Sequence, residues 1–178
     1  MDINPYILES TMLFSGIAAS DYKTVLSCVG ATTQTYAKDE YIFWSDEQLR
    51  CVGLILKGRV LLMKEDVYGN RNIINAMQAG DVFGESFVCG GAYTLTISIQ
   101  ATEKTAVLFL SFDRVLQVCH HACEFHNKLI KNMVAMIARK NLKLLEKLEV
   151  TTQHSLRDKI RAYLSQLAQR QASLTVVS

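Results

Sequence analysis

Several features that would point to other classes of protein are missing from this sequence of 178 residues. No apolar run approaches the roughly 18 residues that a membrane-spanning helix needs. The amino terminus, MDINPYILESTMLF, lacks the basic start of a secretory signal. The five cysteines are odd in number and scattered, which predicts no disulfide framework. The formal net charge of +2 is too small for binding to nucleic acid or membrane over the whole surface. We therefore expect a cytoplasmic protein with no membrane partner.

Histidine is absent from the first 119 residues, which contain all the segments rich in β-forming residues. A metal-dependent barrel oxygenase needs strand histidines and a carboxylate, and no Ser-His-Asp or Cys-His arrangement stands out. We expect no catalytic residue and no enzymatic activity. Cys119, Cys123 and His126 have the i, i+4, i+7 spacing of one helix face, which would suit zinc. Packing into a core is the favoured interpretation, so we expect no metal and no cofactor.

What is present divides the chain into three parts. Residues 4–30 have a helical pattern, with Asp21 as an expected N-cap and Gly30 at the stop. Thr32 to Leu110 holds short β-rich runs separated by turns, a pattern typical of a small antiparallel barrel or sandwich. Within it, TLTISIQA at 94–101 alternates as a strand should, with the leucine and isoleucines on one side.

Residues 112–148 contain neither glycine nor proline, which predicts long helical structure. One apolar stripe has the spacing of a coiled-coil seam, with a polar asparagine of the kind that sets register. A second stripe flanks it, so we expect two partners: the barrel of the same chain and the same helix of a second copy. The alternative is packing against the chain's own domain alone. The predicted homodimer seam is Ile130, Val134, Ile137, Asn141, Leu144 and Leu148, and the flank is Leu129, Met133, Met136 and Leu145.

A last helix is expected after Ser155, a good N-cap residue, with Asp158 at the third helical position. Its apolar face has little sequence left to pack on before the chain stops. That face comprises Leu156, Ile160, Tyr163, Leu164 and Leu167.

In this order, the segments resemble the Crp/Fnr family of bacterial transcription regulators. The matching stretches are Leu13–Ile17, Tyr41–Phe43, Leu56–Val60, Gly80–Glu85, Ala138–Lys140 and Ser155–Ile160. The resemblance implies an α+β fold: a double-stranded antiparallel β-roll, jelly-roll-like, flanked by helices and followed by a long C-terminal dimerisation helix. The implied division is an effector-sensing domain at 1–111, a helix and the dimerisation helix at 112–150, and the start of a DNA-binding domain at 151–178.

The family's nucleotide binders place a cyclic phosphate on a Gly-Glu helix start, with an Arg-Ser or Arg-Thr pair about ten residues later. Here Gly84-Glu85 is followed at that distance by Leu95-Thr96, and no arginine stands between Arg71 and Arg114. The resemblance also puts Leu144 and Leu145 where nucleotide binders have hydroxyl groups. It thus implies a ligand site lined by Gly84, Glu85, Ser86, Leu95, Thr96, Leu144 and Leu145.

Such a site favours an apolar or weakly polar effector and not cyclic AMP, because a buried phosphate without its cation costs several kcal/mol. The alternative is a pocket filled by its own side chains. Residues 1–27 hold no cysteine, which argues against the family's iron–sulfur branch.

The resemblance further implies a regulator in which an effector, touching both the Gly-Glu turn and the long helix, shifts the balance between two dimer geometries. The family continues with a winged helix-turn-helix whose second helix reads the major groove. That helix is absent from this sequence, so DNA would be bound only through a domain that this chain lacks. The other hypothesis is a stand-alone ligand-binding or interaction module of the same fold, without DNA binding.

Overall fold

A computed structural model describes residues 5–66, 68–116 and 124–175, and the chain divides into two compact units, Met1–Val134 and Ala135–Ser178. The N-terminal segment forms short pieces and not one helix: α1 (Pro5–Glu9), the 3-10 turns Met12–Phe14 and Ala19–Asp21, and α2 (Tyr22–Cys28). Asp21 precedes α2 as predicted, but its side chain makes no capping hydrogen bond. The reason is its backbone, which already has helical angles, whereas a capping residue is normally extended.

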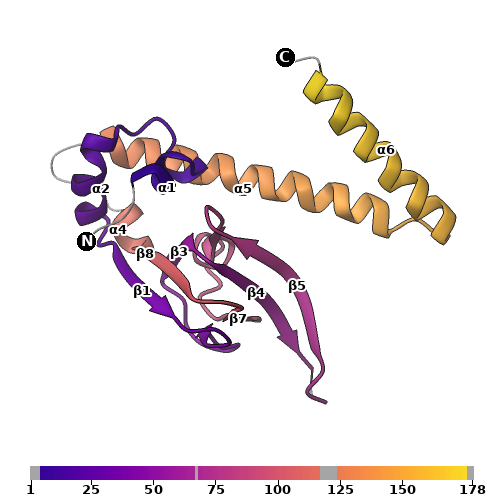
Figure 1. Cartoon of the computed structure of the whole chain (residues 1–178), viewed down its shortest axis with the longest axis horizontal. Coiled ribbons are helices and arrows are strands. Elements are labelled where there is room, and N and C mark those ends of the chain that lie inside the picture. Colours follow the sequence, from indigo (N-terminus) through magenta and orange to yellow (C-terminus); the bar gives the residue numbers. More distant parts are fainter. Residues whose placement is uncertain (1–4, 67, 117–123, 176–178) are drawn as a thin grey trace. The chain divides into compact units, whose positions relative to one another are not determined.

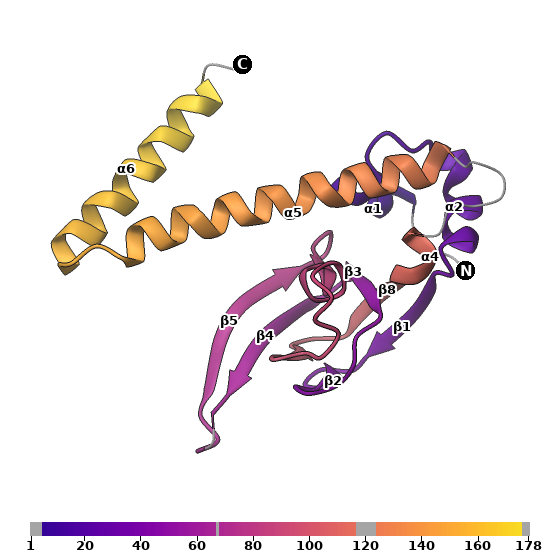
Figure 2. The same cartoon turned by 180° about the vertical axis from the view of Figure 1, so that it is seen from behind.

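The strands of the described residues form two antiparallel sheets of four (Figures 1 and 2). One has the order β1-β8-β3-β6 and the other β2-β7-β4-β5. Their bounds are β1 Thr32–Tyr36, β2 Tyr41–Phe43, β3 Cys51–Lys57, β4 Arg59–Glu65, β5 Arg71–Gln78, β6 Val82–Phe83, β7 Ser98–Ala101 and β8 Thr105–Ser111. This arrangement confirms the predicted α+β class with an antiparallel β-roll.

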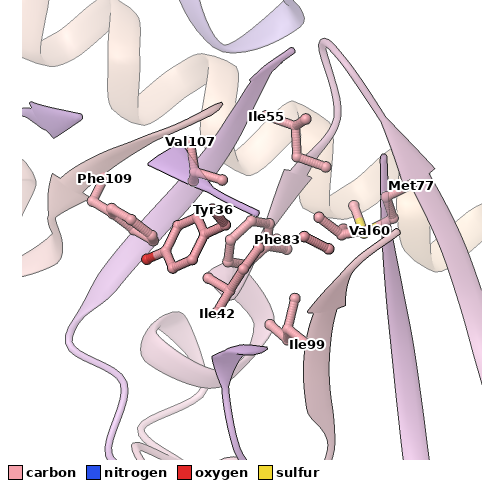
Figure 3. Packing of buried hydrophobic residues seen from close by; sticks show 10 residues of the cluster. Tyr36, Ile42, Ile55, Val60, Met77, Phe83, Ile99, Val107 and Phe109 are labelled. Atoms are coloured by element: carbon pink, nitrogen blue, oxygen red, sulfur yellow. The ribbon is translucent and has the colours of Figure 1, made fainter. Parts of the chain in front are cut away.

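The core between the sheets is centred on Phe109, whose ring meets Tyr36, Phe43 and Phe83 edge-on, with centroids 5.9 to 6.5 Å apart. Such T-shaped contacts suit the charge distribution of aromatic rings. Aliphatic residues from both sheets complete the cluster (Figure 3). The Phe83 ring lies directly on β3 at Gly53, where an added Cβ would overlap Cζ of Phe83. Glycine at position 53 is therefore a condition for this packing.

The predicted strand at 94–101 is shorter than expected, because β7 begins at Ser98. The alternation stops at Ser98, which is buried like Ile99. Its Oγ accepts a hydrogen bond from the Ser45 backbone N–H at 2.9 Å. Upstream, Leu95 exchanges backbone hydrogen bonds with the loop at residues 46 and 47 and not with β4. Ser98, a polar residue of the alternating pattern, is thus buried and hydrogen-bonded. Alternation in the sequence alone does not distinguish such a residue from one exposed to solvent.

The remaining helices are α3 (Glu85–Cys89), α4 (Phe112–Leu116), α5 (Glu124–Thr151) and α6 (Leu156–Thr175). The first part of α5 is fixed to the first unit by buried Leu129 and Met133. The Asn132 amide adds two hydrogen bonds, to the Leu13 and Ser15 carbonyls at 3.0 and 2.7 Å. None of the described helices is long and apolar enough to cross a membrane.

In the second unit, α6 begins as predicted, because the Asp158 backbone N–H donates to Ser155 Oγ at 3.1 Å. A side-chain cap of this kind satisfies a backbone donor that the first turn of a helix leaves open. The Gln166 amide donates to the Glu146 carbonyl at 3.0 Å, which joins α6 to the end of α5.

Candidate functional site

The predicted ligand site is centred on the turn between β6 and α3. Gly84 occupies this turn with φ +86°, in the left-handed region, and serves as the N-cap position of α3. An added Cβ would lie 2.6 Å from Cδ2 of Leu49 and 3.2 Å from the Cys51 carbonyl oxygen. Both the backbone angle and the space therefore require glycine. The Gly84 carbonyl accepts hydrogen bonds from the Phe87 and Val88 N–H groups at 3.1 and 3.2 Å, which starts the helix.

Glu85 and Ser86 form the first turn of α3, as the Gly-Glu motif predicts. The Glu85 side chain is buried, with 3% exposed, and its Oε1 accepts a hydrogen bond from Ser86 Oγ at 3.1 Å. Burial, followed by the charge of Glu85, raises the pKa of the nearby Cys89 thiol. Cys89 Sγ also lies 3.7 Å from Met133 Sδ. The turn thus contacts the roll at Leu49 and Cys51, and the helix it starts contacts the first part of α5 at Met133.

Leu95 and Thr96, the predicted partners of this turn, lie in the segment between α3 and β7. The Leu95 side chain is completely buried, whereas Thr96 is exposed. Backbone hydrogen bonds fix the position of Leu95, from its N–H to the Glu47 carbonyl at 3.0 Å and from the Asp46 N–H to its own carbonyl at 2.8 Å. The residue predicted to stand at the arginine position of the family's nucleotide binders is therefore an apolar side chain packed into the interior.

Leu144 and Leu145 lie on the part of α5 that belongs to the second unit, and each side chain is 55% exposed. The structure brings Gly84, Glu85 and Ser86 together. The roles predicted for Leu95, Thr96, Leu144 and Leu145 toward a ligand remain predictions.

No cluster of metal ligands occurs among the residues that the structure describes. Of the predicted zinc set, Cys119 and Cys123 lie outside the described residues. His126 is buried, and its Nε2 lies 3.2 Å from the Arg114 carbonyl oxygen and 4.0 Å from Cys28 Sγ.

A pocket that the sequence did not suggest lies elsewhere in the first unit. It has a volume of about 330 Å³ and is bordered by β1, β2, β8 and the start of β3. Its lining comes from residues as far apart in the sequence as Thr32 and Ser111. Four of the five residues of β1 are polar and its last is Tyr36, and this short sequence indicates no pocket until its pairing with β8 is known.

Comparison with known families gives a match of the cyclic nucleotide-binding domain model to residues 33–122, just over half of the chain. The chain belongs to the cyclic nucleotide-binding domain family. Residues 33–122 contain the whole turn at Gly84, together with the Leu95-Thr96 pair. No curated protein matches the chain.

Several solved structures share the fold at low sequence identity. The Thermus thermophilus catabolite activator protein is 21% identical with a TM-score of 0.66, over 80% of this chain and 63% of that protein. A cyclic nucleotide-binding domain from Methylobacillus flagellatus is 18% identical with a TM-score of 0.68, over 85% of this chain and 83% of its own. The sensor domain of the transcriptional regulator DNR from Pseudomonas aeruginosa is 14% identical with a TM-score of 0.59, over 85% of this chain and 93% of its own.

This cyclic nucleotide-binding domain thus spans less than two thirds of the Thermus protein. At these identities the structural likeness establishes the fold alone.

The requirement for glycine at position 84 is directly testable. Gly84→Ala is expected to lower the free energy of unfolding by about 2 to 4 kcal/mol, from left-handed strain plus a clash in a packed region. Gly80→Ala is the matched control, because Gly80 has φ +91° but nothing within 4 Å of an added Cβ. It should lose only the strain, about 1 kcal/mol. Urea unfolding of both variants measures the difference, and equal losses would contradict the packing argument.

Proposed function

We propose that this chain is the effector-sensing and dimerising portion of a Crp/Fnr-like transcription regulator. The observation that carries the proposal is the Gly84-Glu85 turn, with Gly84 in the left-handed conformation at the start of α3 within a cyclic nucleotide-binding domain. The likeness in fold to a catabolite activator protein and to a regulator's sensor domain supports the same role. In this proposal, DNA is bound through a further domain that follows α6.

The effector we propose is uncharged and apolar or weakly polar. Backbone N–H groups at the start of α3, the Ser86 hydroxyl and the Thr96 hydroxyl are neutral donors, each contributing about 0.5 to 1.5 kcal/mol net. Leu95 contributes neither charge nor hydrogen bond and is packed inside the protein. A cyclic phosphate keeps a full negative charge, which neutral donors compensate poorly when water is excluded.

The second part of the proposal is a homodimer through α5. The predicted seam residues recur every three or four positions along α5. In the single chain, the side chains of Val134 and Leu148 are 62% and 48% exposed. Exposed apolar residues at coiled-coil spacing are the sequence and surface pattern of a helix that pairs with a second copy.

We also propose that the three predicted segments, 1–111, 112–150 and 151–178, act in sequence as sensor, dimer helix and start of the DNA-binding domain. Helix α5 begins in the first unit and continues into the second. A displacement at its start is therefore transmitted along a continuous backbone.

Mass spectrometry of small molecules released from purified protein tests the sensor proposal. We expect an uncharged compound to be retained by the wild type and lost from a Thr96→Trp variant, in which a bulky side chain replaces an exposed residue predicted to line the site. Gln100→Trp, on β7, is a control at a partly exposed position outside the predicted site. Release of a stoichiometric cyclic nucleotide would contradict the proposed chemistry.

A further inference from the structure

The pocket bordered by β1, β2, β8 and the start of β3 is a cavity distinct from the turn at Gly84. We call it the β1–β8 pocket and define it by Gln34, Tyr36, Phe43, Arg50, Phe109 and Ser111. Its volume of about 330 Å³ lies within the range of roughly 300 to 1,000 Å³ found for small-molecule sites. None of the residues predicted for the effector site lines it.

One wall of the β1–β8 pocket is aromatic. The Phe109 ring is met edge-to-face by the rings of Tyr36 and Phe43. All three rings pack on the hydrophobic core behind them, which fixes their positions. Figure 3 shows Tyr36 and Phe109 next to each other at one end of the core cluster, opposite Met77. A rigid aromatic wall favours a flat, apolar group that can pack against it.

Hydrogen-bond donors line the same cavity. The Tyr36 hydroxyl donates a hydrogen bond to Gln34 Oε1 at 2.6 Å. Because the amide oxygen of Gln34 is engaged in this bond, its N–H₂ group is the part of the amide that can donate to a ligand. Ser111 adds a hydroxyl, and its backbone is held by a hydrogen bond from its N–H to the Val29 carbonyl at 3.2 Å. These groups would fix the orientation of a ligand that carries oxygen acceptors.

The charge around the cavity is positive. Arg50 is the charged residue in the lining, and its guanidinium lies over the Tyr93 ring at 5.6 Å from the centroid. Arg114 packs on Gly30 at the edge of the pocket, where an added Cβ would be 2.9 Å from Nη1. Within the described part of the chain, neither guanidinium has a carboxylate within 4.0 Å. Two arginines beside an aromatic cavity, without acidic partners, match the chemistry of an anion.

Nearby acidic groups do not cancel this charge. Glu40, whose charge contributes to raising the pKa of Tyr36, directs its Oε2 to the Ala37 N–H at 2.7 Å. Burial raises the pKa of the Cys51 thiol, which also lines the pocket, to about 11, so the thiol is neutral at pH 7.

We propose that the β1–β8 pocket is a second ligand site, which binds a small planar aromatic carboxylate. The ring packs against Phe43 and Phe109, and the carboxylate is held by Arg50 and Arg114 with the Gln34 amide as a further donor. This inference is independent of the proposed regulator function, because the two sites share no residue.

Isothermal titration with indole-3-acetate, and with indole-3-acetamide as the uncharged counterpart, tests the charge requirement. We expect saturable binding of the carboxylate with a dissociation constant below about 1 mM, and at least about tenfold weaker binding of the amide, as for loss of one charge-assisted contact. The double variant Arg50→Gln/Arg114→Gln should weaken the carboxylate by about tenfold or more. Arg59→Gln, an exposed arginine at the start of β4, is the matched control and should bind like wild type.

Thr32→Phe tests the location, because this exposed β1 residue lines the pocket and a phenyl group there would fill it without disturbing the core. It should abolish carboxylate binding while leaving the unfolding midpoint within a few degrees. Absence of saturable binding by the wild-type protein would overturn the proposal. Equal affinity for acid and amide, or full binding by Thr32→Phe, would overturn it as well.

Discussion

Titration of the wild-type protein with cyclic AMP or cyclic GMP is expected to give no saturable heat at micromolar concentrations. The Gly84-Glu85 turn offers neutral donors, and Leu95, the residue predicted at the position of the cation, is apolar and completely buried. The absence of a charge-assisted phosphate contact and of polar contacts to the base should cost more than about 4 kcal/mol, roughly a thousandfold in affinity. Micromolar binding would mean that a cation reaches the turn from another part of the protein.

A variant that gains affinity for cyclic AMP tests the same explanation. Leu95→Arg places a charge inside the protein and should lower the free energy of unfolding by about 3 to 5 kcal/mol. Cyclic AMP should raise the melting temperature of this variant, because the phosphate pairs with the buried guanidinium. Leu110→Arg buries a charge on β8, at another completely buried leucine, and should show no such rescue.

If Leu95→Arg does not fold, Thr96→Arg offers the guanidinium from the adjacent exposed position without burying it. Measurable affinity of this variant for cyclic AMP, together with none for the wild type, is the expected result. Rescue of Leu110→Arg to the same extent as Leu95→Arg would show that the effect is unrelated to the turn.

Val134→Lys is expected to convert a dimer into monomers in sedimentation velocity. Val134 lies in the predicted seam and is 62% exposed in the single chain, so lysine there should leave the monomer fold intact. In a two-fold symmetric seam, the lysine charges of the two chains are buried close to each other, which costs several kcal/mol. The dimer dissociation constant should therefore rise by more than a hundredfold.

Leu142→Lys is the matched control for the dimer. It lies on the same helix, is 60% exposed and falls outside the seam spacing, so its dimer should sediment like the wild type. A wild-type mass equal to one chain would contradict the proposed dimer. Dissociation by Leu142→Lys as strong as by Val134→Lys would place the interface on a different face of α5.

The sequence by itself determined the features that depend on neighbouring residues. Glycines with positive φ, such as Gly30 and Gly80, were readable as a helix stop and a turn because other residues are strained there. The Ser155 cap and the absence of helix breakers after Ser111 predicted α6 and the described part of the helical region. The order of these segments then led to the fold, which the structure confirms.

Only the tertiary structure decided which side chains of those segments are enclosed. Leu95 and Ser98 belong to opposite sides of the predicted alternation, yet both are buried. Leu95 lies before β7 and bonds to the loop at residues 46 and 47, whereas Ser98 pairs with Met63 of β4 and accepts a hydrogen bond from the Ser45 N–H. The β1–β8 pocket brings Arg50 beside residues of β1 and β8, whose pairing register joins Thr32 to Phe109. A periodic pattern records the two faces of one strand, whereas a cavity is formed by the register between strands far apart in the chain, and no local preference encodes that register.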